Sequence, residues 1–369
     1  MKKFFLSLIC ITAGLLLGGL ILKFAGIDAI EAYKVMWNGA FSRPGYIANI
    51  IIRSTPLILT GLSVAFAFRT GLFNIGAEGQ FIMGALSAAF FGVMFNFNPW
   101  IQIPAVIFFS LIVSGIYGGF AGFLKARFGV HEVISTIMLN WIALYFSNYM
   151  VQRVGFHKPG TETSEYINPS TSLTFFEDWK SSDSAIEFFS RHSLLGEFMR
   201  PSVNAGILFA LVAAIIVWFI LKKTTFGFKL KAVGSSIEAA RYAGINVNKK
   251  MTQSMMISGA LSGLAGATHV MGVSKNVAIL AAHEGYGFDG IAVSLIGANS
   301  PMGSVLAGFF LGGLKYSGQK LQSALEAPSE VIGIMIGAII FFIAIPIVFE
   351  KPLNKLFLKV SKKWSQHHE

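Results

Sequence analysis

The sequence predicts an all-α integral membrane protein, and three observations lead to this fold class. Of its 369 residues, 54% are hydrophobic and only 13% are charged, whereas soluble domains carry roughly a quarter charged residues. The apolar residues form long uninterrupted runs, and a helix needs about 20 of them to cross a bilayer. The alternating segments of about ten residues that build membrane β-barrels are missing from the sequence.

Ten apolar stretches predict about ten transmembrane helices of this length. The first follows Met1-Lys2-Lys3 and is longer than the core of a secretory signal, so we expect it to remain as a span. The eighth and ninth are short and rich in glycine, which indicates partial or broken helices. In chain order the stretches are 4–22, 50–68, 77–97, 101–124, 133–152, 203–221, 252–272, 286–299, 303–320 and 330–349.

A long polar segment, 153–200, divides the chain into a first half, 1–152, and a second half, 201–350. Each half holds five stretches, so two related halves would enter the membrane in opposite directions. Phe73-Asn74-Ile75-Gly76 and Phe288-Asp289-Gly290-Ile291 are a short echo of one another in the two halves. We therefore predict two inverted five-helix halves, joined by an extracytoplasmic loop.

The distribution of charge predicts the orientation. Basic residues concentrate in 222–250, which has Glu238 as its one acid, and again in the tail 351–369. Loops on the cytoplasmic side of a membrane carry an excess of Lys and Arg, so we place both segments and the N-terminus in the cytoplasm. This orientation explains the net charge of +11 without nucleic-acid binding. The basic residues of 222–250 are Lys222, Lys223, Lys229, Lys231, Arg241, Lys249 and Lys250.

Polar residues at membrane depth are the candidates for function. Glu78 lies in a glycine-rich break before the third span and is expected to face a wet or protein-lined interior, or alternatively to cap that span near the inner interface. Asn140, in the middle of the fifth span, either bonds to a neighbouring helix or lines a pore. The predicted pathway residues are Asn74, Glu78, Gln80, Asn140, Phe288 and Asp289.

Motifs of enzymes and nucleotide binding are missing. Residues 285–290 fit G-x-G-x-x-G literally but lie between membrane spans rather than after a strand, so we reject a dinucleotide site. The sequence has no P-loop and no H-E-x-x-H motif, and we predict neither a metal site nor a cofactor. A secondary transporter driven by an ion gradient remains an alternative, although Glu78 and Asp289 fall on opposite sides of the membrane in this topology. A membrane-embedded enzyme is a further alternative without a matching catalytic set.

Residues 222–250 predict a short helix on the inner face. Ser235 and Glu238 have capping-box spacing at the start of a helix over 237–243, and Gly244 can end it. Such a helix is too short and too polar to span a membrane. It is either an ordinary helical loop or a docking element for the groove of a partner.

Several of these segments together resemble the permease subunits of bacterial ATP-binding-cassette (ABC) importers, in the superfamily for branched-chain amino acids, ribose and nucleosides. The resemblance covers about residues 40–350, with no match for 160–200. The run Asn-Ile-Gly-Ala-Glu-Gly-Gln is most like the nucleoside and simple-sugar branch. The similar segments are Ser54–Leu62, Arg69–Gln80, Gly129–Asn140, Thr225–Ile245 and Ile257–Gly266.

The resemblance implies a nucleoside permease in the bacterial inner membrane, with ribose or another simple sugar as the alternative substrate. It also implies three kinds of partner: an ATP-binding subunit that hydrolyses the ATP, a second homologous permease subunit, and a substrate-binding lipoprotein or periplasmic protein. The short inner-face helix would be the coupling helix that rests on the ATP-binding subunit. Its residues would be Ser235, Ser236, Glu238, Ala239, Ala240, Arg241, Tyr242 and Gly244.

Overall fold

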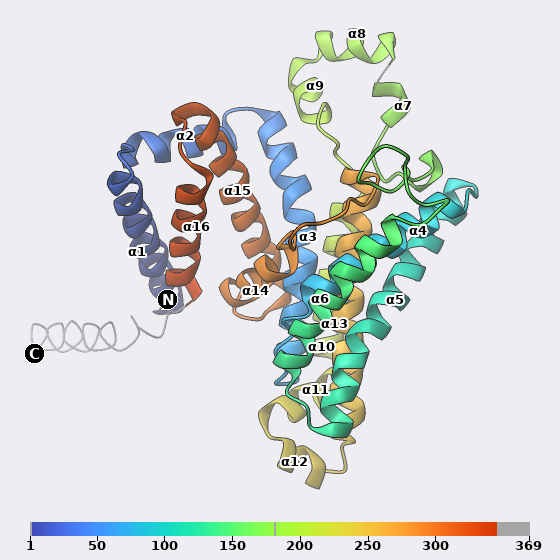
Figure 1. Cartoon of the computed structure of the whole chain (residues 1–369). Helices are drawn as coiled ribbons and strands as arrows, with labels where there is room; N and C mark the ends of the chain where they lie inside the picture. The colour runs from blue at the N-terminus through green and yellow to red at the C-terminus, as the bar shows by residue number, and fades with distance from the viewer. Residues whose placement is uncertain (1, 181, 345–369) are drawn as a thin grey trace, which may run out of the picture. The chain divides into compact units, whose positions relative to one another are not determined.

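The computed structural model describes residues 2–180 and 182–344, and these residues are helical apart from loops and three isolated β-bridges. Residues 345–349 of the last predicted stretch and the basic tail 351–369 lie outside the described residues. The helices are α1 (Lys2–Phe24), α2 (Ala29–Phe41), α3 (Pro44–Phe68), α4 (Ala77–Met94), α5 (Pro99–Phe128), α6 (Glu132–Val151), η1 (Pro169–Thr171), α7 (Glu177–Lys180), α8 (Asp183–Arg191), α9 (Ser193–Met199), α10 (Gly206–Lys223), α11 (Thr225–Ser235), α12 (Ile237–Tyr242), α13 (Val247–His269), η2 (Val270–Ser274), α14 (Tyr286–Ile296), α15 (Pro301–Leu325) and α16 (Ser329–Ala344) (Figure 1).

The chain forms two compact units, Met1–Ser42 with Leu314–Glu369, and Arg43–Gly313. In the first unit α1 packs along α16. A Cβ on Gly14 would lie 2.9 Å from the Ile339 Cα, so glycine permits the close approach. The helix α2 was not predicted as an element. It turns by 117° from α1, and Asp28 caps it by accepting hydrogen bonds from the amides of Ile30 and Glu31.

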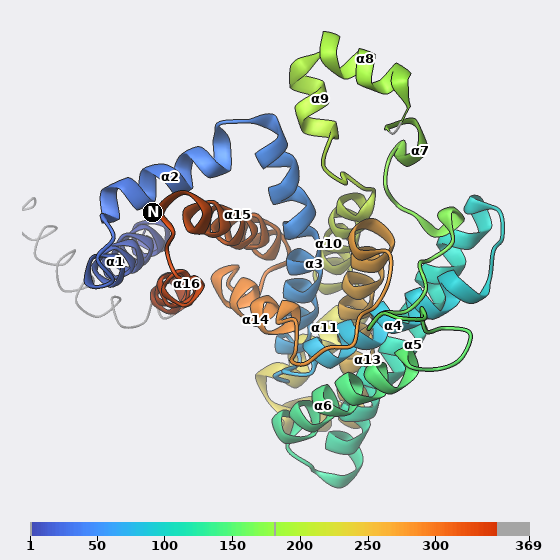
Figure 2. The same cartoon turned by 45° about the horizontal axis from the view of Figure 1, so that its top comes forward.

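The second unit is built around α3 and α13, which pack against each other and against α4, α5 and α14 (Figure 2). Small residues let these helices approach closely, as is usual between membrane helices. Gly84 of α4 lies against Gly263 of α13. Hydroxyl groups complete the contact between α3 and α13, where Ser63 bonds to Ser258 at 2.9 Å and to Ser262 at 2.8 Å.

Five helices in the described residues are long and apolar enough to cross a membrane: α3, α4, α5, α10, and α13 continued by η2. The bent pair of α1 and α2 would make a sixth, and α14 and α16 are shorter apolar helices. The eighth stretch is short, since α14 has 11 residues. The ninth stretch was wrongly expected to be partial or broken, because α15 runs unbroken for 25 residues. Its glycines serve packing instead: Gly308 lies against Ile58 and Gly312 against Ser54 of α3.

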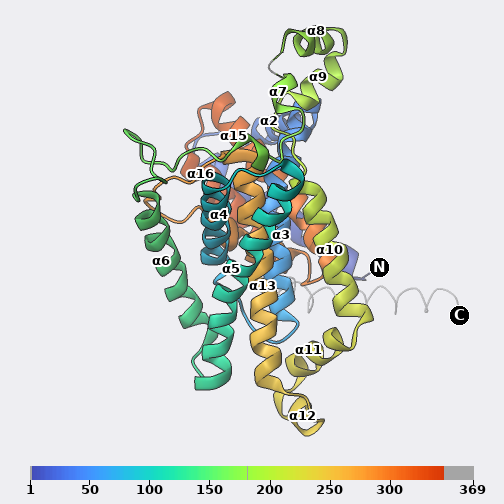
Figure 3. The same ribbon diagram turned by 90° about the vertical axis from the view of Figure 1, so that its right-hand side faces the viewer.

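The polar segment after α6 is attached to the chain that follows α13. The amide of Leu173 donates to the carbonyl of Met271, and that of Ser164 donates to the carbonyl of Val277. Lys275 adds an ion pair with Glu177 at 2.9 Å. Figure 3 shows α7, α8 and α9 beyond one end of the bundle, and α11 and α12 at the opposite end.

Candidate functional site

Two helices of the larger unit begin in its interior, α4 and α14. Each starts with a glycine N-cap, Gly76 and Gly285, so neither has a capping side chain of its own. The first amides of a helix have no partner within the helix and need one from elsewhere when they are buried. Side chains of other helices supply these partners, and they include most of the predicted pathway residues.

Asn140 of α6 forms hydrogen bonds with the start of α4. Its Oδ1 accepts a hydrogen bond from the amide of Gly79 at 2.8 Å, and its Nδ2 donates to the carbonyl of Ile75 at 3.0 Å. A Cβ on Gly79 would lie 2.9 Å from the Asn140 Cα, so glycine is needed for this approach. The sequence left two roles open for Asn140, a bond to a neighbouring helix or the lining of a pore. The structure shows the hydrogen bonds to the neighbouring helix.

Glu78 forms hydrogen bonds with the start of α14. Its two carboxylate oxygens accept from the amides of Gly285 at 2.8 Å and Gly287 at 2.6 Å, and its side chain is fully buried. A carboxylate at a helix N-terminus is favoured by the helix dipole. The carboxylate of Glu78 therefore joins α4 to α14 instead of capping its own helix.

Asn74 and Gln80 form a reciprocal amide pair across the turn before α4. The Nδ2 of Asn74 donates to the Gln80 Oε1 at 2.8 Å, and the Gln80 Nε2 donates to the Asn74 Oδ1 at 3.1 Å. Asn74 also donates to the Ser258 Oγ of α13 at 2.7 Å. Both residues are buried, and their hydrogen bonds stabilise the turn between α3 and α4.

Phe288 and Asp289 lie in the first turn of α14, next to the amides that Glu78 binds. Phe288 is 41% exposed and its ring contacts His283. Glu78 and Asp289 lie close together here, although the predicted topology separates them across the membrane. The start of α14 folds back onto α4, which the order of apolar stretches along the chain does not reveal.

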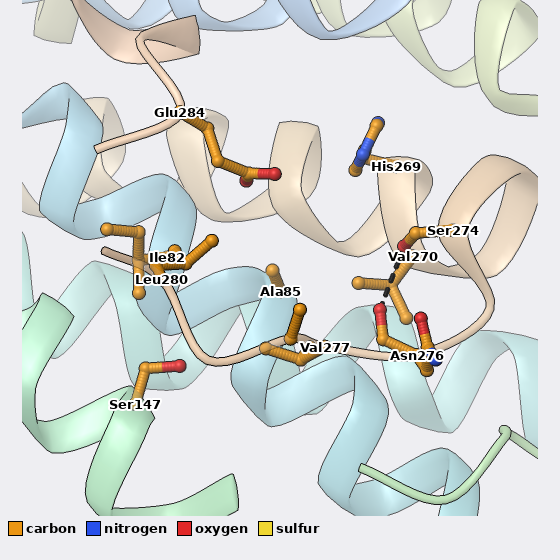
Figure 4. Close-up of a pocket in the computed structure, with 11 residues that line it drawn as sticks. Ile82, Ala85, Ser147, His269, Val270, Ser274, Asn276, Val277, Leu280 and Glu284 are labelled. Atoms are coloured by element: carbon orange, nitrogen blue, oxygen red, sulfur yellow. Dashed lines mark hydrogen bonds between the residues drawn. The ribbon is translucent and has the colours of Figure 1, made fainter. Parts of the chain in front are cut away.

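A cavity of about 100 Å³ lies beside this junction, between α4, α6, α13, η2 and the connector 275–285 (Figure 4). Ser147 contributes a buried hydroxyl with no hydrogen-bond partner among the described residues. The lining of the cavity contains both polar and apolar residues, as is usual for small-molecule sites. The lining residues are Ile82, Ala85, Ser147, His269, Val270, Ser274, Asn276, Val277, Ala278, Leu280 and Glu284.

An aromatic cluster adjoins the cavity and was not predicted. The ring of Phe81 stacks on Tyr286 with centroids 4.9 Å apart, and His269 lies 5.0 Å from Tyr286. The Thr60 hydroxyl donates to the carbonyl of Tyr286 at 3.0 Å, which fixes the start of α14. Phe81 and His269 lie within apolar runs of the sequence, where no sequence pattern distinguishes them from ordinary core residues.

The short helix predicted over 237–243 forms as α12, but its N-cap is Ser236 and not Ser235. Ser235 is the last residue of α11, so its backbone is helical, whereas Ser236 is extended and its Oγ accepts from the amide of Ala239 at 3.2 Å. Gly244 ends the turn with a φ of +76°. Ala240 is buried in the bundle, whereas Tyr242 is 96% exposed. Most of α12 is therefore free to contact another molecule.

The helix before it, α11, packs on the turn that leads into α4. A Cβ on Gly234 would overlap the carbonyl oxygen of Arg69 and lie 3.0 Å from the amide of Gly71. Gly71 adopts a φ of +73°, which glycine allows without strain. Helix α11 thus touches the same turn whose far end holds Asn74.

These features define a class of protein: a multi-pass α-helical membrane protein with helices that start in its interior and a separate short helix that is mostly exposed. The chain belongs to the family described as "Branched-chain amino acid transport system / permease component", whose model matches residues 46–344. It is therefore a transport subunit of an ABC system and not an enzyme, with no cofactor of its own. No group of metal-binding side chains occurs in the part of the chain that the structure describes.

Curated relatives match almost the whole chain. The "Guanosine ABC transporter permease protein NupP" of Bacillus subtilis is 41% identical over 95% of this chain and 95% of its own length. The "Nucleoside ABC transporter permease protein NupB" of Lactococcus lactis is 35% identical over 96% of this chain and 94% of its own. A third relative, "Glucose ABC transporter permease protein TsgB13" of Haloferax volcanii, is 28% identical over 90% and 85%. No solved structure matches the chain.

Proposed function

We propose that this chain is the permease subunit of an ATP-driven importer for nucleosides. The observation that carries the proposal is the 41% identity to a guanosine permease over 95% of both chains. The geometry is compatible with it, because a partly exposed aromatic ring such as that of Tyr286 can stack on a base while nearby polar groups bind a ribose.

The proposed arrangement has about ten crossings in two inverted halves, with both termini and 222–250 in the cytoplasm. A second homologous permease subunit completes the pore. A binding lipoprotein or periplasmic protein delivers the nucleoside on the outer face, and an ATP-binding subunit receives α12. In support, a relative of the second-subunit kind exists, the "Guanosine ABC transporter permease protein NupQ", which is 29% identical over 72% of this chain.

Within the pathway we propose two kinds of residue. Asn74, Gln80 and Asn140 position the start of α4, and Glu78 positions the start of α14. Phe288 and Asp289 lie on the first turn of α14, so they would move with it. This view keeps all six residues at the pathway but assigns the four buried ones to positioning rather than to direct contact with substrate.

A simple sugar is the second candidate substrate, and the 28% identity to a glucose permease favours it. Uptake by cells that express the complete transporter separates the two. We expect labelled guanosine to enter and unlabelled nucleosides to compete, while ribose and glucose do not compete. Uptake of sugar alone would refute the nucleoside assignment.

The coupling role of α12 has its own test. Glu238→Ala together with Arg241→Ala removes two exposed side chains of α12, so we expect less ATP-binding subunit to co-purify while the permease still inserts. The matched control is Lys223→Ala with Lys229→Ala, which alters two exposed residues outside α12. Unchanged co-purification of the α12 variant would refute the coupling role.

A further inference from the structure

A second cavity, of about 250 Å³, lies at the α11–α12 end of the larger unit, and the transport function does not account for it. It is formed where α3 ends, α10 ends, α11 passes and α15 begins. Three of its eight lining residues are basic and none is acidic. The lining residues are Arg69, Trp218, Leu221, Lys222, Lys231, Ser300, Pro301 and Met302.

The three basic residues come from separate elements. Arg69 is the C-cap of α3, Lys222 lies in the last turn of α10, and Lys231 lies in α11. A hydrogen bond of 2.7 Å from the Arg69 Nη2 to the carbonyl of Asn299 fixes the guanidinium beside the start of α15. Neither Lys222 nor Lys231 forms a salt bridge with a residue that the structure describes. Cations that converge without a carboxylate attract a compact anion such as a phosphate.

The other side of the cavity is apolar, and further apolar residues of α10 are exposed beyond it. Trp218 and Leu221 line the cavity itself, and Trp is common at the level of lipid headgroups. On the same helix an apolar stripe at helical spacing remains exposed, by 51–56% for each side chain. These stripe residues are Leu208, Val212, Ile215, Ile216 and Phe219.

We propose that this cavity binds the phosphate headgroup of an anionic phospholipid, such as phosphatidylglycerol, whose acyl chains lie along the α10 stripe. Basic pockets between membrane helices on the cytoplasmic side suit such headgroups. A volume of 250 Å³ corresponds to about eight liquid waters, enough for a glycerol phosphate group. The apolar stripe favours a lipid over a soluble phosphate, because a soluble anion would leave the stripe unused.

The lipid would have a defined structural effect. It would neutralise the positive charges of Lys222 and Lys231, and would join α10 and α11 to the turn at Arg69. Since α11 also packs on that turn through Gly234, the headgroup would stabilise the segment that carries α12. The proposal depends on the membrane location of the chain and not on the identity of its substrate.

Native mass spectrometry of the purified full-length chain tests the site. We expect phosphatidylglycerol to bind more tightly than phosphatidylcholine. Lys222→Gln with Lys231→Gln should weaken phosphatidylglycerol binding by about 25-fold, from roughly fivefold per lysine near a headgroup. The matched control, Lys223→Gln with Lys229→Gln, removes the same charge from exposed residues of the same segment that do not line the cavity. This control should change binding less than about twofold.

A conservative variant and a fluorescence measurement test the same site further. Lys222→Arg with Lys231→Arg should retain binding, so a failure of the Gln variant cannot be attributed to misfolding. Phosphatidylglycerol with brominated acyl chains should quench the fluorescence of Trp218, and Trp218→Phe should remove that component. Equal binding of both lipids, equal loss in the control variant, absent quenching, or full competition by inorganic phosphate or ATP would each overturn the proposal.

Discussion

Glu78→Gln tests whether the carboxylate of α4 holds the start of α14. The wild-type side chain accepts two hydrogen bonds, from Gly285 at 2.8 Å and from Gly287 at 2.6 Å, in a fully buried position. A glutamine has nearly the same shape but only one acceptor oxygen. Its amide group would bring N–H donors against the second backbone N–H, which is then left without an acceptor.

The magnitude follows from these contacts. A hydrogen bond to a charged group contributes about 1.5–3 kcal/mol, and one of the two bonds is lost. The lost charge at the α14 N-terminus removes about 1 kcal/mol more. We expect Glu78→Gln to lower the free energy of unfolding by about 3 kcal/mol, and Glu78→Ala to lower it further, because both amides then lose their partner.

The assay is equilibrium unfolding of the purified full-length chain in detergent micelles, with Glu238→Gln as the control. Glu238 is also an acid near a helix start, but it is exposed, so its loss should change the free energy by less than about 0.5 kcal/mol. Equal stability of Glu78→Gln and the control would refute the capping role of Glu78. Hydrogen exchange at Gly287 adds a local readout, and we expect faster exchange in the Gln variant alone.

Two further predictions concern the ends of the bundle. Gly234→Val should lower the free energy of unfolding by about 1–3 kcal/mol, because the larger side chain overpacks against the carbonyl of Arg69, and it should reduce uptake. The control is Gly337→Val, because an added Cβ there meets nothing within 4 Å. Equal effects of the two variants would contradict the packing argument. At the other end, burial raises the pKa of Glu177, but hydrogen bonds from Ser172 and Lys275 outweigh it and hold that pKa below 4.5. The Glu177–Lys275 contact should therefore be complete above pH 4.5 and be lost as the pH falls through the lowered pKa, which protease cleavage within 175–200 would report. Glu177→Gln should abolish this acid dependence and Glu187→Gln should retain it, since Glu187 forms its ion pair with the exposed Arg191 of its own helix.

Much of the fold could be predicted from the sequence, because long apolar runs and their boundaries are local properties. The helices α3, α4, α5, α6, α10 and α13 begin and end within a few residues of the predicted stretches. The break before α4 was also predictable, since glycines alternate with amides and an acid there. The short helix α14 was expected from its limited apolar run, and α12 from its capping residues.

The remaining features depend on contacts between distant residues. Glu78 and Gly287 are 209 positions apart, so nothing local indicates that they meet. The glycines of α15 have the composition of a broken helix, but they lie against α3 and serve its close approach. Ser235 and Ser236 are adjacent and chemically alike. Which of them caps α12 is decided by where α11 ends, and a spacing rule does not contain that information.

The interior amides of α14 have consequences for how the transporter can open. Two of them depend on the carboxylate of Glu78, a residue of another helix, so α14 cannot swing away from α4 and stay dry. Any such movement must bring water, or a polar part of the cargo, to the exposed N–H groups at the same moment. Hydration of this one helix end and the opening of a route through the bilayer would then be a single event.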